Sequence, residues 1–325
     1  MGGDFAPRNV IIGALDALRQ TDNRFEILLI GPEQKIRAEL DALDHLGLSV
    51  QVINATEVID MHATATAAIK QKRDSSIAVG ITLHKEGRAQ AFVSAGHTGA
   101  VMSASTLILG RIEGVGRPTI GMSLPSERGI CLVLDAGANV DCKPQHLYEF
   151  AVMGSIYMNK MLQINSPTVG LLSIGEESSK GNEVTLEAYK LLSNSKLNFI
   201  GNVEGGDILK GKTDVVVCDG FVGNILLKFA EGVLDLLKAR FRTHAATGLH
   251  RKILVGMMYG TLKKILKDFD YQEHGGVPLL GVNGVSIIGH GKSTPKAIKN
   301  MILRAEEMVT KEIARSIEES LKGSR

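Results

Sequence analysis

The sequence has 325 residues, of which 44% are hydrophobic and 22% are charged, as in a folded globular chain rather than a disordered one. Basic residues exceed acidic residues by only 37 to 35, which argues against a general nucleic-acid-binding protein. No run of 18 apolar residues occurs, and the amino-terminal stretch lacks the basic and apolar regions of a signal peptide. We therefore expect a cytoplasmic protein without a membrane-spanning segment.

The glycine and cysteine contents indicate which kinds of site to expect. The 36 glycines exceed the usual share of about 7%, which indicates many tight turns and close approaches of backbone to ligands. Cys131, Cys142 and Cys218 lie in or beside apolar runs, and none belongs to a CxxC pair. The sequence therefore predicts neither a disulfide framework nor a metal site, and it gives no sign of a cofactor.

Short apolar runs rich in β-branched residues alternate with helical patterns along most of the chain. The runs predict strands at 25–30, 48–53, 89–95, 119–124, 130–135, 168–174, 197–201, 214–219 and 285–289. Apolar residues at i, i+3 and i+4 predict helices within 7–18, 32–43, 97–109, 145–158, 182–192 and 295–321. This alternation is typical of an α/β fold with a largely parallel sheet. No linker divides the chain, so we expect residues 1–325 to form a single unit.

Residues 222–270 break the alternation. They contain two long helical patterns joined near Thr247 and Gly248, and they predict a helical hairpin that protrudes from the α/β body. Residues 228–267 contain nine lysines and arginines but only two acidic residues, so this hairpin carries a basic patch.

The loops that follow the predicted strands carry the candidate site. In open α/β sheets, ligands bind beyond the carboxyl ends of the strands, near helix amino termini that favour anions. After the strand at 89–95, the loop AGHTGA enters a helix and offers Gly96, His97, Thr98 and Gly99 as a phosphate cradle. The alternative is that these glycines only tighten a turn.

Four further strand ends carry polar side chains. Asn139 follows the strand at 130–135; Lys180 and Asn182 follow 168–174; Asp219 and Asn224 follow 214–219; and His290 follows 285–289. Each loop alone could be a solvated turn with helix-capping residues, but we expect all five loops to converge on one edge of the sheet.

One motif match is rejected. Residues 206–213 satisfy GxxxxGK[ST], the nucleotide-binding P-loop pattern. A P-loop requires a helix directly after Thr213, whereas the following residues predict a strand. We therefore interpret the match as an accident within a β-turn-β connection.

These loops resemble those of the PlsX-type phosphate acyltransferases, bacterial enzymes of phospholipid synthesis. The resemblance runs along almost the whole chain, through MGGDFAP (1–7), KRDSS (72–76), SAGHTGA (94–100), LDAGANVDCKPQHLYEFAVMGSIY (134–157), VGLLSIGEESSKGNE (169–183), NFIGNVEG (198–205), DVVVCDGFVGNILLK (214–228) and GGVPLLGVNGVSIIGHGKS (275–293). It departs from the family pattern at His97, where asparagine is usual, and at Lys292, where a small polar residue is usual. Residues 60–71 lack the family's usual acidic-Pro pattern, and a short strand usually precedes Met1.

The resemblance implies a three-layer α/β/α fold of the isocitrate and isopropylmalate dehydrogenase group. It also implies transfer of a fatty acyl group from acyl carrier protein to inorganic phosphate, which gives acyl phosphate. A homodimer, peripheral membrane contact and a membrane acyltransferase that consumes the acyl phosphate are the further implied partners. Two other functions stay open: a phosphotransacetylase-like enzyme that uses acyl-CoA, and a non-catalytic scaffold for lipid synthesis.

The reaction requires a held phosphate, a stabilised carbonyl oxygen and an acid for the departing thiol. Our hypothesis gives the phosphate to the AGHTGA loop with Lys180 and Asn182, and the carbonyl oxygen to Asn139 and Asn224. His290 is then the acid, and Asp219 orients donors or acts as a base.

The hairpin mixes apolar and basic side chains, which suits an anionic membrane surface or acidic acyl carrier protein. Its expected contact residues are Arg251, Lys252, Leu254, Met258, Lys263, Lys264 and Lys267. The alternative is a dimer-packing bundle with a solvated basic face.

Overall fold

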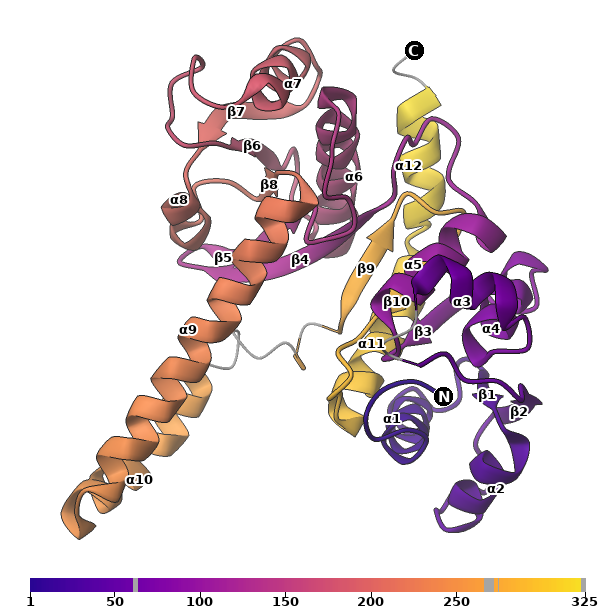
Figure 1. Ribbon diagram of the computed structural model, residues 1–325. Coiled ribbons are helices and arrows are strands. Elements are labelled where there is room, and N and C mark those ends of the chain that lie inside the picture. The colour runs from indigo at the N-terminus through magenta and orange to yellow at the C-terminus, as the bar shows by residue number, and fades with distance from the viewer. Residues whose placement is uncertain (61–63, 266–271, 274, 323–325) are drawn as a thin grey trace.

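The computed structural model describes residues 1–60, 64–265, 272, 273 and 275–322. Its main feature is a twisted eight-stranded sheet (Figure 1). In spatial order the strands are β3 (Ala91–Ser94), β10 (Val285–Ile288), β9 (Val277–Leu280), β4 (Thr119–Ser126), β5 (Gly129–Leu134), β8 (Val215–Val217), β6 (Thr168–Leu172) and β7 (Asn198–Val203). Four of the seven pairings are parallel, and the predicted α/β class with a largely parallel sheet is confirmed.

The sheet consists of two halves whose parallel strands run in opposite directions. The first half is β3 and β10, the second half is β5, β8, β6 and β7, and β9 and β4 lie between them. Three successive antiparallel pairings, β10–β9, β9–β4 and β4–β5, reverse the direction between them. Our expectation that all five loops leave one edge of the sheet is therefore wrong.

The last residues of β10 and β5 nevertheless lie at the same height along β4. Strand β9 pairs only with Thr119 and Ile120 at the start of β4, whereas β5 pairs with Gly121–Ser126. Leu134, the last residue of β5, pairs with Gly121. Ile288, the last residue of β10, pairs with Val277 of β9, and the register of β9 with β4, when continued, places Val277 beside Met122. The loops of both halves thus begin near Gly121 and leave it in opposite directions.

Helices cover both faces of the sheet, because alternate strand residues face opposite sides. On β5, Leu132 and Leu134 belong to one buried cluster and Cys131 and Val133 to the other. The first cluster includes residues of α6 (Pro144–Leu162), α7 (Glu183–Ser193), α11 (Pro295–Thr310) and α12 (Ile313–Lys322). The second includes residues of α3 (Ala65–Gln71), α4 (Ser76–Lys85), α5 (Thr98–Ala104), the π-helical turn Ser105–Leu109 and α8 (Gly205–Lys210). The three-layer α/β/α arrangement is therefore confirmed.

A small peripheral unit holds the first two predicted strands. β1 (Ile27–Gly31) and β2 (Val50–Asn54) pair only with each other and pack with α1 (Arg8–Gln20) and α2 (Glu33–Asp41). In Figure 1 this unit lies beside α11, on which α1 packs.

Three local expectations are corrected. Strand β9 was not predicted, since it has four residues and Pro278 lacks an N–H. The single helix expected at 295–321 is two helices, because α11 packs on β3 and β10 whereas α12 packs on α6, and the turn between them places Glu312 at φ 50°. The rejected P-loop match contains helix α8 instead of a simple turn; as expected, a strand, β8, follows it.

Helices α9 (Gly220–Ala246) and α10 (Leu249–Ile265) pack against each other and project from the body (Figure 1). The described structure contains no helix long and apolar enough to cross a membrane. Arg251, Lys252, Leu254 and Met258 are exposed on α10. Lys263 and Lys264 lie near its end, and Lys267 lies outside the described residues.

A buried histidine gives the fold a predicted pH dependence. The His84 ring donates from Nδ1 to the Ala89 carbonyl over 2.9 Å and accepts at Nε2 from the Val285 N–H over 3.0 Å. Burial lowers the pKa of His84. Protonation would turn the Nε2 acceptor into a donor facing another donor, so the folded state favours the neutral ring.

The unfolded chain therefore takes up this proton at a higher pH than the folded chain does. As pH falls from about 6.5 toward the lowered folded pKa, we expect the unfolding free energy to fall by about 1 kcal/mol from this site, with no further loss below it. Urea unfolding at about pH 7.5 and 5.5 measures this, with His84→Gln as a non-titrating control. Equal pH dependence in the two proteins would contradict the prediction.

Candidate functional site

The loops after β3 and β10 meet at the first half of the sheet, together with the chain's amino-terminal segment. The Gly289 N–H donates to the Ser94 carbonyl, and the Asp4 N–H donates to the Gly291 carbonyl, over 2.8 and 2.7 Å. A Cβ on Gly2 would lie 2.9 Å from the Gly96 nitrogen, so the segment packs directly on the loop. The predicted residues of these two loops are thus brought together.

Within the AGHTGA loop, His97 serves as the amino-terminal cap of α5. Its Nδ1 accepts from the Ala100 N–H over 3.2 Å, which is the usual role of an asparagine side chain at such a position. The Gly96 N–H is already bonded to the Ser94 hydroxyl. The exposed Thr98 and its neighbour Gly99 form the first two residues of α5.

His290 is held in one orientation by its own loop. The Lys292 N–H donates to Nδ1 over 3.1 Å, so in the neutral ring the proton lies on Nε2. The side chain is exposed, whereas Ser293 is buried and donates its hydroxyl to the His290 carbonyl over 2.6 Å.

A buried carboxylate organises the loop after β5. Asp135 has no exposed surface and follows a cis Leu134–Asp135 peptide bond. One carboxylate oxygen accepts from the Ile120 and Ala138 N–H groups at 3.1 Å, and the other accepts from the Asn139 backbone and side-chain nitrogens at 2.6 and 2.8 Å. Burial raises the pKa of Asp135, and these four hydrogen bonds oppose that rise.

The side-chain amide of Asn139 belongs to this network. Its amide nitrogen donates both to Asp135 and to the Pro118 carbonyl, over 2.8 Å in each case. An amide has two such hydrogens, so in this arrangement Asn139 fixes the loop and has no hydrogen left for a substrate oxygen.

The start of α9 packs directly on the same loop. The Gly220 N–H donates to the Asn139 carbonyl over 2.8 Å, and a Cβ on Gly223 would lie only 1.8 Å from the Asp135 carbonyl oxygen. Asp219 caps α9 by accepting from the Val222 N–H over 2.8 Å. Asn224 is exposed and packs its Cβ beside Gly137. Asn139, Asp219 and Asn224 therefore form one group.

The loop after β6 lies next to this group in the sheet order, beyond β8. Asn182 caps α7, accepting from the Thr185 N–H over 2.9 Å, and the Lys180 carbonyl accepts from the Ser173 hydroxyl. The Lys180 side chain is exposed.

The structure therefore sorts the candidates into two groups. His97, Thr98 and His290 belong to the first half of the sheet, whereas Asn139, Lys180, Asn182, Asp219 and Asn224 belong to the second. Five strands separate β3 from β6, so the strands that carry the AGHTGA loop and the Lys180 loop lie far apart in the sheet order.

The thiols near these loops are poor nucleophiles. Burial raises the pKa of Cys142 to about 12 and that of Cys218 well above its ordinary value. Among the described residues, no cluster of three or more histidine, cysteine and acidic side chains could hold a metal ion.

The sequence model of the family described as "Fatty acid synthesis protein" matches residues 1–316. The chain belongs to this family. It is 49% identical over 309 residues to a phosphate acyltransferase of Desulforudis audaxviator, with 95% of this chain and 90% of the relative covered. It is also 49% identical over 321 residues to a phosphate acyltransferase of Pelotomaculum thermopropionicum, with 99% and 93% covered. The family predicted from the sequence is confirmed.

Solved structures of this fold include more distant proteins. A phosphotransacetylase from Streptococcus pyogenes superposes with a TM-score of 0.63, at 18% identity, over 94% of this chain and 92% of its own. A branched-chain phosphotransacylase from Enterococcus faecalis V583 gives 0.55, at 14% identity, over 95% and 96%. At these identities the likeness concerns the fold.

Two elements of the candidate site were missing from the sequence-based hypothesis. The segment Gly2–Asp4 packs on loops that lie far along the chain, and its only local signal is a pair of glycines. The Asp135 network joins the β5 loop to Ile120 of β4, and its signal was an acidic residue directly after a predicted strand.

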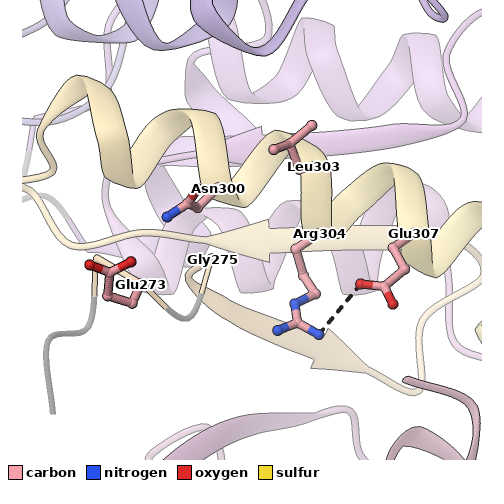
Figure 2. Close-up of a pocket in the computed structure, with 6 residues that line it drawn as sticks. All are labelled: Glu273, Gly275, Asn300, Leu303, Arg304 and Glu307. Atoms are coloured by element: carbon pink, nitrogen blue, oxygen red, sulfur yellow. Dashed lines mark ion pairs between the residues drawn. The ribbon is translucent and has the colours of Figure 1, made fainter. Parts of the chain in front are cut away.

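Two surface cavities lie away from these loops. One, of about 160 Å³, opens beside α11, where Figure 2 shows Arg304 paired with Glu307; it is lined by Glu273, Gly275, Asn300, Leu303, Arg304 and Glu307. A larger one, of about 350 Å³, is lined in part by His84, Val285 and Ile313. Neither lining includes a predicted site residue.

Proposed function

We propose that this protein transfers a fatty acyl group from acyl carrier protein to inorganic phosphate and so supplies acyl phosphate for phospholipid synthesis. The observation that carries this proposal is near full-length identity of 46–49% to proteins named phosphate acyltransferase, together with the fatty acid synthesis family. The fold likeness to phosphotransacetylases adds no preference for acyl-CoA, because such distant neighbours share architecture without necessarily sharing substrates.

The chemistry needs no covalent enzyme intermediate. A phosphate oxygen attacks the thioester carbonyl carbon, a tetrahedral intermediate forms, and the carbon–sulfur bond breaks to leave acyl phosphate and a thiolate that takes up a proton. Phosphate is already a competent nucleophile, so the enzyme's tasks are positioning and charge stabilisation. The raised thiol pKa values of Cys142 and Cys218 agree with this direct route.

The groups described above divide these tasks. The first turn of α5, with Thr98 and Gly99, holds the phosphate through N–H groups and a hydroxyl. His290 gives its Nε2 proton to the departing sulfur, because Lys292 fixes the other ring nitrogen as an acceptor. Asn224 donates to the carbonyl oxygen, while Asn139 and Asp219 hold the loop and the helix from which Asn224 projects. Lys180 and Asn182 lie in the β6 loop, which is next in the sheet order to the group that contains Asn224.

A hydroxylamine-trapping assay tests the proposal. Purified protein is mixed with long-chain acyl carrier protein and inorganic phosphate, and any acyl phosphate is trapped as the hydroxamate; parallel reactions use acyl-CoA or omit phosphate. Phosphate-dependent product from the carrier-protein donor alone supports the proposal. Product from acyl-CoA alone favours the phosphotransacetylase-like alternative, and carrier-protein binding without product favours a scaffold.

The proposal extends to the hairpin. More than half of the exposed large apolar side chains of the described structure lie on α9 and α10, and they are Phe221, Val222, Ile225, Phe229, Val233, Leu236, Leu237, Phe241, Ile253, Leu254, Met257 and Met258. An apolar surface of this kind is typical of a contact face. We assign the α9 surface to a homodimer, and the basic, apolar tip of α10 to an anionic membrane surface.

Leu254→Glu should weaken binding to vesicles that contain anionic lipid by about tenfold or more, because it adds a charge to a half-exposed apolar contact. Binding by the unchanged protein should also weaken as salt is raised. Vesicle co-sedimentation measures both effects, and Leu46→Glu, at an exposed apolar position distant in sequence from the hairpin, is the matched control. Indifference to both salt and Leu254→Glu would rule out the membrane assignment.

A further inference from the structure

Arg117 lies in the segment that enters β4, and a buried carboxylate fixes its backbone. Glu149 of α6, only 4% exposed, accepts from the Gly116 N–H over 2.7 Å. Arg111 donates to the Gly116 carbonyl from the other side. The backbone of Arg117 is therefore held rigidly, although its side chain is exposed.

This position borders the proposed site. The next residue, Pro118, accepts through its carbonyl from the Asn139 amide, which also bonds to Asp135. Arg117 is thus one residue from the network that orders the β5 loop. The positive charge of Arg117 acts on Cys142 and on His146, at the end of that loop and the start of α6. The guanidinium therefore lies on the side of the β5 loop.

The charge of Arg117 is uncompensated. Within the described residues, its guanidinium has no ion-pair or hydrogen-bond partner. Many of the other arginines are paired, as Arg24 is with Glu306 and Arg315 with Glu319. A guanidinium without a partner among the described residues, on a backbone fixed beside the proposed site, is well suited to bind an anion, since its planar fork makes two parallel hydrogen bonds.

We infer that Arg117 binds a phosphoryl group of one of the two substrates. This inference rests on the proposed function. The phosphoryl group comes either from inorganic phosphate or from the phosphodiester that links the thiol arm of the acyl donor to its carrier. Both present paired oxygens to a guanidinium.

Steady-state kinetics of Arg117→Gln separates the two sources. Phosphate is varied at saturating acyl carrier protein donor, and the donor is then varied at saturating phosphate. In Arg117→Gln we expect the KM of one substrate to rise by about tenfold or more. In Arg117→Lys, which keeps the positive charge but loses the planar guanidinium, the same KM should rise less. A rise for phosphate identifies the acceptor, and a rise for the donor identifies its phosphodiester.

Arg128→Gln is the matched control, because Arg128 is also exposed and lies at the far end of the β4–β5 pair. It should leave both KM values unchanged. Unchanged KM values in Arg117→Gln, a loss confined to kcat, or an equal effect of Arg128→Gln would overturn the inference.

A second measurement uses the unaltered protein and needs neither turnover nor a folded variant. Phenylglyoxal modifies accessible arginines, and peptide mass mapping reports the extent at each one. Phosphate or acyl carrier protein donor should slow modification of Arg117 by about fivefold or more without slowing that of Arg128. Protection by neither substrate would overturn the inference. If the protein makes no acyl phosphate yet phosphate still protects Arg117, the site stands while the proposed activity fails.

Discussion

Gly223→Ala should destabilise the protein by about 3 kcal/mol and abolish acyl phosphate formation. The new Cβ would lie 1.8 Å from the Asp135 carbonyl oxygen and 3.2 Å from the Cys218 sulfur, so either α9 or the β5 loop must move. Movement of that loop would break the set of hydrogen bonds that Asp135 accepts from Ile120, Ala138 and Asn139. Urea unfolding and the hydroxamate assay measure the two effects.

Gly232→Ala is the matched control on the same helix. Gly232 is exposed, and a Cβ there would meet no atom within 4 Å. Because alanine is the better helix former, this variant should be more stable than the unchanged protein by about 0.5–1 kcal/mol. If Gly223→Ala matched the stability of Gly232→Ala, the close packing of α9 on Asp135 would not hold in solution.

His290→Asn should lower kcat by about 100-fold or more while changing the KM for phosphate by less than about threefold. The asparagine oxygen can still accept from the Lys292 N–H in place of Nδ1, so the loop keeps its shape. What is lost is the Nε2 proton, which the proposed mechanism gives to the departing sulfur. Steady-state kinetics with the acyl carrier protein donor measures the change.

Added imidazole separates acid catalysis from a structural role. It should restore part of the activity of His290→Asn, because it supplies the missing proton donor. His45→Asn is the control, since His45 lies in the loop between α2 and β2 and its ring bonds to the Leu43 carbonyl. A kcat within threefold of the unchanged protein, or no rescue by imidazole, would remove His290 from the acid role.

Local sequence signals predicted most elements and several of their boundaries. Pro295 and Thr294 marked the start of α11, and Thr294 indeed caps it. Three predicted site residues are also helix caps, as the alternative interpretation expected. His97, Asn182 and Asp219 each accept a hydrogen bond from the backbone N–H three residues ahead. A capping role is compatible with a role in the proposed site, because capping fixes the amino-terminal turns of helices, where anions bind.

The long-range arrangement did not follow from these signals. Strand β9, with its proline and four residues, inserts between β10 and β4, and the antiparallel pairings β10–β9, β9–β4 and β4–β5 together reverse the strand direction, so the five loops form two groups. The placement of Asp4 on Gly291 and of Gly223 on Asp135 also joins distant parts of the chain.

The sequence by itself determined the α/β class, the strand and helix patterns and the family, because periodicity, capping and long motif strings depend on residues a few positions apart. Only the tertiary structure decided which loops lie together, that the Asn139 amide donates to Asp135 and Pro118, and that Arg117, unpaired among the described residues, lies beside them. The reason is physical: these outcomes depend on strand order and on close contacts between segments far apart in the chain, and such contacts leave no periodic signal in the sequence.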